Sequence, residues 1–439
     1  MKNITVLLAK SKYFFIAWCM IAAFGTYFCM YAYRKPFTAG TYIGLEWLGM
    51  DYKTVLIIAQ VFGYMLSKFI GIKVISELKA ASRQSLIIGL ILFAEVSLIL
   101  FGLVPHPYNF VFLFLNGLPL GMVWGVVFSY LEGRRFTEVL ATGFCINLVV
   151  TSGFLKTIYF QIHHLLPTIT EFWLPAFIGL VFLPLFLLFV WMLSVIPAPN
   201  KADKLLRAER LPMTSDDKKT VIKQYGWGIL CFVLIYIILA TMRDFRDNFA
   251  VEIWTQIDSS WNSAVFSQTE TITGFIVLIV IGSLSLIKNN RKAFNTTAAL
   301  IAVGLTLSGF STLLFQLHRI TPFWWMLLVG MGMFLAYIPI QVVFFERMIA
   351  LFKIKANAGF LIYICDSAGY MGSVAILLYK EFFMKDLSWA KVLMQFSYLL
   401  TVVGLVLLVF GLLFFKGKEE ENVSNNNSLL PAINGLANN

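Results

Sequence analysis

Charged residues are scarce in this chain. Only 13% of its 439 residues are Asp, Glu, Lys or Arg, whereas 59% are hydrophobic and 16% are aromatic. Ordinary soluble domains are about 45–50% apolar and about 25% charged. A soluble core of this length cannot hide so much apolar surface, so lipid must serve as the solvent. The composition predicts a polytopic membrane protein.

Cysteine and histidine are also few. The five cysteines are odd in number, lie within apolar segments and form no CxxC or Cys/His spacing, which argues against a disulfide framework and against a metal cluster. We interpret the neighbouring pair His163 and His164 as incidental. The sequence also has no GxxxxGK[ST] motif and no recognisable nucleophile–base pair. We therefore expect no enzyme, no cofactor and no metal.

Twelve apolar segments follow one another along the chain, each near the roughly 20 residues that span a bilayer. A polar stretch divides them six and six, and the tenth contains Pro339, where we expect a kink. The predicted fold is an all-α membrane protein with twelve transmembrane helices in two pseudo-symmetric six-helix bundles. The segments are 14–34, 53–74, 85–104, 109–131, 139–161, 172–196, 226–249, 262–287, 294–317, 322–349, 357–379 and 390–415.

The predicted domains are a first bundle (1–196), a cytoplasmic linker (197–224), a second bundle (225–415) and a disordered tail (416–439). Most Lys and Arg residues fall on one side of the membrane if both termini are cytoplasmic, so we predict that both termini are cytoplasmic. This topology, with anionic lipid, explains the net charge of +11, so we expect no nucleic-acid partner. We predict a monomer in the cell (inner or cytoplasmic) membrane.

The two halves share a sequence pattern. The segment TGFCINLVVTSGFLK (142–156) aligns without gaps on AGFLIYICDSAGYMG (358–372). Spacings of nine and seven residues also recur near the start of each half, in Trp18, Tyr27 and Arg34 and again in Trp227, Tyr236 and Arg243. Together these matches indicate an internal duplication, which places the two arginines at equivalent points.

Arginines inside a membrane usually face a partner or a cavity, because a central cation costs about 2.5–3.5 kcal/mol. Arg34 and Arg243 lie near the ends of their segments, so one interpretation is that they reach the lipid headgroups. The alternative is that both face a shared axis, where two guanidinium groups would bind a tetrahedral oxyanion. Lys35 and Arg246 fit the headgroup interpretation.

Other charges lie within the apolar segments. Lys68 is expected to face a cavity. For Lys156, a position facing a cavity and a position at the membrane interface are both compatible with the sequence. Asp366 could carry a coupling proton or form a structural ion pair with Lys156 or Arg243, and the sequence does not decide between these roles.

Acidic residues near helix ends have simpler interpretations. Glu132 and Glu346 each end a helix beside an arginine, which favours gating or structural ion pairs. Asp244 and Asp247 flank Arg243 and are interpreted as neutralising Arg246 at the surface.

Four motifs resemble a known family. YAYRKPFTAG (31–40) looks like the end of helix 1 in the organophosphate:phosphate antiporters, which are the glycerol-phosphate and hexose-phosphate transporters of the major facilitator superfamily. In that family an Arg-Lys-x-Phe stretch supplies a phosphate-binding arginine. YMLSKFIG (64–71), GMVWG (121–125) and GYMGSVA (369–375) are similar to its helices 2, 4 and 11. The resemblance spans nearly the whole transmembrane region.

The resemblance implies that both arginines bind substrate phosphate and that Lys68 is a pocket cation. The family's helix 5 histidine falls near Val149 here, so its role is absent or has moved. The predicted substrate-binding residues are Arg34, Arg243, Lys68, Tyr27 and Tyr236.

These observations predict a secondary transporter that moves a small anion, a phosphate or organophosphate, by alternating access in exchange for inorganic phosphate. Two alternatives remain open. One is proton-coupled transport of another small solute using Asp366. The other is a membrane sensor that has a transporter fold and binds a ligand without moving it.

Overall fold

The protein is described by a computed structural model that covers residues 8, 11–76, 78–131, 140, 143–197, 215–284, 286–352, 354, 358–384 and 387–436. Among these residues, eleven helices are long and apolar enough to cross a membrane. The helix α16 (Ala358–Phe383) adds a twelfth long helix. The protein is therefore an all-α, multi-pass membrane protein, as the hydropathy predicted.

The long helices begin and end close to the predicted bounds in most cases. The first half contains α2 (Lys12–Ala32), α3 (Tyr52–Ser76), α4 (Arg83–Leu103), α5 (Phe110–Leu131), α7 (Asn147–Leu165) and α8 (Leu174–Ser194). The second half contains α10 (Ser215–Asn248), α12 (Ala264–Leu284), α13 (Asn290–Gln316), α14 (Pro322–Pro339), α16 and α17 (Trp389–Leu436).

Two of these helices differ from the predictions at their ends. α10 begins at Ser215, inside the predicted linker, of which residues 198–214 lie outside the described residues. α17 continues to Leu436, through the segment predicted to be a disordered tail. The Arg291 guanidinium lies 2.6 Å from the Glu419 carboxylate, and Lys418 lies 2.7 Å from Glu421 one turn along. These pairs accompany the helical conformation just beyond the apolar segment.

Short elements connect the long helices. A 3₁₀ turn, η1 (Pro36–Ala39), follows α2, and another, η2 (Ala80–Ser82), precedes α4. The two-residue strands β1 (Glu46–Trp47) and β2 (Met50–Asp51) form an antiparallel hairpin before α3. The helix α11 (Ala250–Ile257) follows α10 after a single residue.

α14 ends at Pro339, the residue at which a kink was predicted. A π-helical turn, η3 (Ile340–Phe344), follows it and leads into α15 (Phe345–Phe352). Proline has no N–H to donate and its ring crowds the preceding turn, so the regular hydrogen-bond ladder cannot continue through it.

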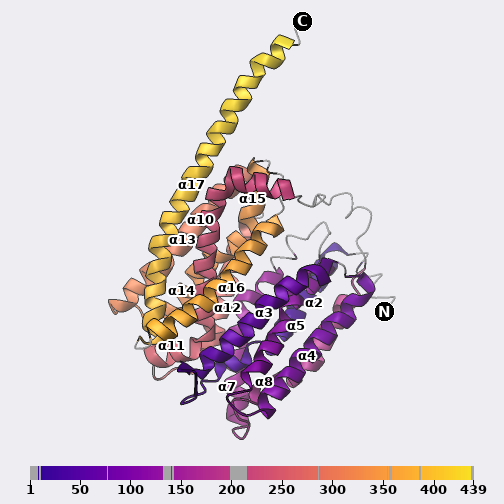
Figure 1. Ribbon diagram of the computed structural model, residues 1–439, viewed down its shortest axis with the longest axis vertical. Helices are drawn as coiled ribbons and strands as arrows, with labels where there is room; N and C mark the ends of the chain where they lie inside the picture. Colours follow the sequence, from indigo (N-terminus) through magenta and orange to yellow (C-terminus); the bar gives the residue numbers. More distant parts are fainter. Residues whose placement is uncertain are drawn as a thin grey trace.

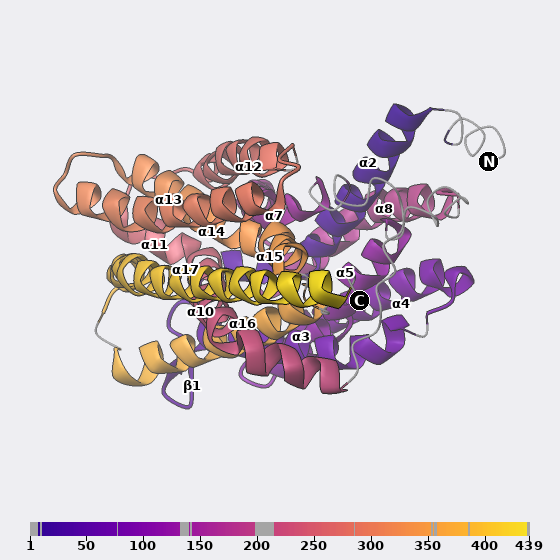
Figure 2. The same cartoon turned by 90° about the horizontal axis from the view of Figure 1, so that it is seen from above.

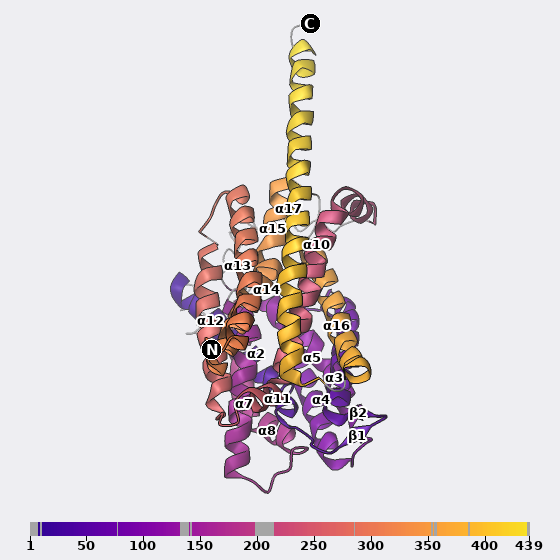
Figure 3. The same cartoon turned by 90° about the vertical axis from the view of Figure 1, so that its left-hand side faces the viewer.

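The two halves lie side by side (Figure 1). Seen from above, α7 packs on α12 along one side of the boundary and α3 packs on α16 along the other (Figure 2). The β1–β2 hairpin lies at the lower end of Figure 3, and the chain ends at the upper end. We name these the hairpin end and the linker end, since α10 begins at the latter.

Glycines allow helices within each half to approach closely. A Cβ atom at Gly117 of α5 would lie 2.3 Å from the Gln60 carbonyl oxygen of α3, and one at Gly63 would lie 2.1 Å from the Phe114 oxygen. In the second half, a Cβ atom at Gly304 would lie 2.5 Å from the Gly332 oxygen. Small residues at such contacts are typical of membrane helix packing.

Ion pairs join the halves at the hairpin end. The Lys35 ammonium lies 2.5 Å from the Asp247 carboxylate and donates a 2.9 Å hydrogen bond to the Asn248 side chain. Lys156 of α7 binds the other carboxylate oxygen of Asp247, also at 2.5 Å. Two cations of the first half thus hold one carboxylate of the second.

The prediction that Lys35 reaches the headgroups is wrong, and so is the surface position predicted for Asp247. Their side chains are only 7% and 15% exposed. Hydropathy places both residues near helix ends, but it does not reveal that the buried turn η1 and the helix α11 cover this end of the molecule.

Further contacts join the two halves at the hairpin end. Lys53 of α3 lies 2.5 Å from the Glu252 carboxylate of α11. Burial raises the pKa of the Glu252 carboxyl, and the Lys53 ammonium opposes that rise. The Glu381 carboxylate of α16 accepts hydrogen bonds from the Asp51 N–H at 3.3 Å and from the Thr54 hydroxyl at 3.0 Å.

The close contact of α3 and α5 at Gly117 can be tested with a matched pair of substitutions. Gly117→Ala should destabilise the protein by about 1–3 kcal/mol, because the added methyl group must push α3 away from α5. Gly89→Ala in α4 meets no atom within 4 Å, and it should be neutral or stabilise by up to about 1 kcal/mol. The free energy of unfolding in detergent tests both, and equal effects would contradict the packing argument.

Asp247→Asn should cost about 3–5 kcal/mol, because it leaves Lys35 and Lys156 buried without their shared carboxylate. The control is Asp216→Asn, whose pair with Lys219 is 4.0 Å long and largely exposed, and which should change stability by less than about 0.5 kcal/mol. Unfolding of the two variants in detergent gives the comparison. Equal stability of Asp247→Asn and wild type would show that the ion triad does not hold the halves together.

Candidate functional site

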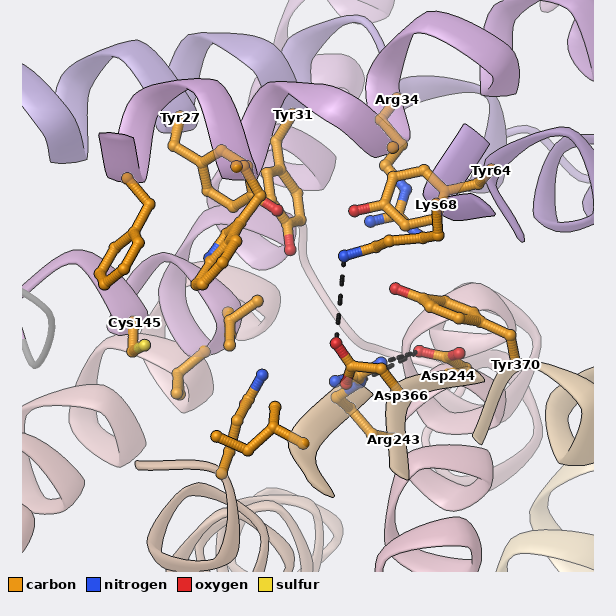
Figure 4. Close-up of a pocket in the computed structure, with 18 of the residues that line it drawn as sticks. Tyr27, Tyr31, Arg34, Tyr64, Lys68, Cys145, Arg243, Asp244, Asp366 and Tyr370 are labelled. Carbon is orange, nitrogen blue, oxygen red and sulfur yellow. Dashed lines mark hydrogen bonds and ion pairs between the residues drawn. The ribbon is translucent and has the colours of Figure 1, made fainter. Parts of the chain in front are cut away.

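A cavity of about 800 Å³ lies between the two halves and is lined by residues of both. Its lining runs from Arg34, near the hairpin end, to Arg83, Ser129 and Glu346 at the linker end. The deep part is a cluster of charged and tyrosine side chains that point toward one another (Figure 4). The cavity is therefore closed on the hairpin side by the ion pairs and reaches the linker end on the other.

Arg34 lies in the turn directly after α2, where its backbone N–H donates to the Tyr31 carbonyl at 3.0 Å. Its guanidinium carbon lies 3.9 Å from the centre of the Tyr64 ring, a cation–π contact that orients the group. The residue is 8% exposed, and its buried Nε has no hydrogen-bond partner in the part of the chain that the structure describes. No carboxylate of the described residues lies within 4.0 Å of it. Arg34 therefore presents donors to the cavity without a salt-bridge partner among the described residues.

Arg243 lies within α10, on the opposite wall. Its Nε and Nη2 lie 3.0 and 2.8 Å from one oxygen of Asp244, and its Nη1 donates to the Tyr337 hydroxyl. The Ser373 hydroxyl donates to the other Asp244 oxygen at 2.9 Å. The second arginine is thus fixed in position, with its charge partly balanced by its neighbour in sequence.

Asp366 of α16 faces Lys68 of α3 across the cavity, with 3.9 Å between the carboxylate and the ammonium (Figure 4). Asp366 also accepts a hydrogen bond from the Tyr236 hydroxyl, which lies 2.8 Å from that of Tyr337. Its basic partner in the structure is Lys68, instead of the Lys156 or Arg243 considered from the sequence. The pair crosses the boundary between the halves inside the cavity.

The remaining sequence candidates occupy different positions. Tyr27 lines the cavity, whereas the buried Tyr236 lies behind the lining and holds Asp366 and Tyr337 from there. Lys156 also lies behind the lining, since its ammonium binds Asp247. Glu346 lines the linker end of the cavity, and Glu132 lies outside the described residues.

Two buried acidic residues inside the predicted apolar segments were not predicted from the sequence. Glu270 of α12 lines the cavity, accepts the Gly153 N–H, and lies 4.0 Å from Arg246, which is buried instead of reaching the headgroups. Glu95 of α4 is 4% exposed, and neither of its carboxylate oxygens has a hydrogen-bond partner among the described residues. Both lie inside apolar segments, the signal that identified Asp366, and could have been found by it.

Within the described part of the chain, no group of three His, Cys, Asp or Glu side chains is placed to hold a metal ion. The charged and tyrosine residues of the cavity offer hydrogen-bond donors and acceptors.

Three solved structures share this architecture. A peptide transporter POT is 16% identical, with a TM-score of 0.61, and the match covers 90% of this chain and 94% of that one. Nucleoside transporter NupG is 15% identical, with a TM-score of 0.59 and coverage of 90% and 98%. A D-xylose–proton symporter is 15% identical, with a TM-score of 0.58 and coverage of 92% and 98%. At these identities the likeness shows the fold alone, which is a membrane-transporter fold.

No curated protein matches the chain in sequence. A protein family does match, over residues 36–418, which is most of the chain; α2, Arg34 and Lys35 lie before the matched range. The protein therefore belongs to the family of unknown function DUF5690.

Proposed function

We propose that this protein is a secondary active transporter that moves a phosphate or organophosphate by alternating access, in exchange for inorganic phosphate. One observation carries the proposal: Arg34 and Arg243, one from each half, line the same cavity. We further propose that it acts as a monomer in the cell membrane, with the linker end and both termini in the cytoplasm.

The chemistry of the cavity favours an anion. A guanidinium group presents a planar set of donors that matches the oxygens of a phosphate, and Arg34 has no carboxylate partner among the described residues. A buried cation without a balancing charge is costly, so a bound anion would stabilise it. Lys68 lies on the same wall and adds a second donor.

The arrangement of the closed end supports alternating access. The ion pairs of Asp247 and Glu252 close the hairpin end, while the cavity reaches the linker end. An anion bound between Arg34 and Arg243 would draw the halves together around it, and separation of the ion pairs would then open the other side. The neighbours in fold are named as transporters of peptides, a nucleoside and D-xylose, which supports transport as the activity.

Counterflow of labelled inorganic phosphate in proteoliposomes tests the proposal. Vesicles loaded with unlabelled phosphate should accumulate label without a pH gradient, because the carrier returns only when loaded. Ligand binding without any flux would instead indicate a sensor, and neither binding nor flux would overturn the proposal.

In the same assay, Arg34→Lys and Arg243→Lys should each lower exchange by roughly tenfold to a hundredfold. A charge-assisted hydrogen bond contributes about 1.5–3 kcal/mol, and the lysine point charge cannot replace the guanidinium fork. The control is Arg319→Lys, at an exposed site between α13 and α14, which should exchange at the wild-type rate. Wild-type rates in Arg34→Lys or Arg243→Lys would refute the assignment of that arginine.

A second candidate, proton-coupled transport of another small solute, is favoured by the Asp366–Lys68 contact, which crosses the two halves inside the cavity. If Asp366 carries the proton, an inwardly directed proton gradient accelerates uptake by wild type. Asp366→Asn should remove that acceleration, because an amide does not titrate. Asp216→Asn, on the exposed start of α10, serves as the control. Acceleration that persists in Asp366→Asn would exclude Asp366 as the carrier.

A further inference from the structure

One wall of the cavity is aromatic and lies beside the cationic cluster. Trp124 and Phe128 of α5 both line the cavity and are half-buried. Their rings stack with 5.0 Å between centres and 11° between planes. Phe144, which is fully buried, lies behind Trp124 with 5.9 Å between ring centres. The indole is therefore held in place by packing while part of it faces the open space.

Trp124 lies beside the side chains that we propose to bind the anion. The Lys68 ammonium lies 5.8 Å from the centre of the Trp124 ring and 5.5 Å from that of Tyr64, the ring against which Arg34 lies. α3 and α5 both run from the hairpin end to the linker end, so Trp124 and then Phe128 follow the cationic cluster toward the cavity mouth. A molecule whose anionic group is bound by Arg34 and Lys68 would place its other end against this aromatic wall.

The charges of the deep cavity favour a dianion. Counted as ionised, six basic side chains line it or bind its lining, against four acidic ones, so two positive charges are in excess among the described residues. The mouth adds one charge of each sign, Arg83 and Glu346. The basic groups are Arg34, Lys35, Lys68, Lys156, Arg243 and Arg246, and the acidic groups are Asp244, Asp247, Glu270 and Asp366.

The size of the cavity excludes a small ion as the ligand that fills it. Pockets of about 300–1,000 Å³ hold drug-sized organic molecules, and this cavity has about 800 Å³. An inorganic phosphate bound at Arg34 would leave the aromatic wall in contact with water. Aromatic surface beside an anion site is better matched by a flat ring, which gains stacking and apolar contact there.

We infer that the transported ligand is a phosphate monoester with a flat aromatic group, such as an aryl or heteroaryl phosphate, whose ring stacks on Trp124. This inference rests on the proposed function for its anion site and adds the nature of the organic part. Trp124 is then the residue that determines specificity for the ring, while Arg34 and Lys68 bind the phosphate.

Competition in the counterflow assay tests the inference. The probes are inorganic phosphate, cyclohexyl phosphate and phenyl phosphate as competitors of labelled phosphate. Phenyl phosphate should inhibit at about tenfold lower concentration than the other two, a difference of about 1.4 kcal/mol. Phenyl methyl phosphate, which has the ring but a single negative charge, should inhibit much less than phenyl phosphate.

Trp124→Leu should remove the advantage of phenyl phosphate over cyclohexyl phosphate, because the ring on which the phenyl group would stack is gone. The control is Trp227→Leu, at a site that is 75% exposed on α10, which should behave as wild type. Equal inhibition by the three phosphates in wild type, or an advantage that survives Trp124→Leu, overturns the inference while phosphate exchange itself still stands.

A binding measurement separates this inference from the proposed transport. Phenyl phosphate should raise the melting temperature of the purified protein in detergent more than inorganic phosphate does, and Trp124→Leu should abolish the difference. If this holds without any phosphate exchange, the ligand class stands and the antiport proposal fails. If phenyl phosphate has no greater effect than inorganic phosphate, the ligand class is wrong.

Discussion

The carboxylate of Asp247 is the contact on which the arrangement of the two halves most depends. It accepts Lys35, from the turn after α2, and Lys156, from α7, each at 2.5 Å. In a medium without water, two buried ammonium groups would repel each other strongly, so their shared carboxylate must stay where both can reach it. Because the cations belong to the first half and the carboxylate to the second, this requirement helps to close the hairpin end, together with the Lys53–Glu252 pair, while the cavity extends to the linker end.

The pairing of buried cations with carboxylates is also found in the cavity. Most of its cations have an acidic partner nearby: Arg243 has Asp244, and Lys68 has Asp366. Arg34 differs, since it lies against the Tyr64 ring with no carboxylate close to it in the described part of the chain. The anion site that we propose rests on this difference between Arg34 and the other cations of the cavity.

The long helices could be predicted because the bilayer imposes a length and a polarity on each span. Both properties can be read from a run of consecutive residues. The β1–β2 hairpin and the helix α11 were not predicted, since they are short and their sequences carry no membrane-length signal. The helix break at Pro339 could be predicted because proline lacks a backbone N–H and therefore interrupts the helix at its own position. The positions of Lys35 and Arg246 were predicted wrongly, since apolarity along the chain does not tell which helix end other segments cover.

By itself the sequence determined the membrane environment, the run of long helices and the placement of an arginine near the end of a helix in each half, because hydropathy and spacing are properties of neighbouring residues. Only the tertiary structure decided which charges meet. Asp247 pairs with residues more than 90 positions away, and the partner of Asp366 is Lys68 in the other half. Ion pairing depends on distances of a few ångströms between helices that pack side by side, and that information is absent from the order of residues along any one of them.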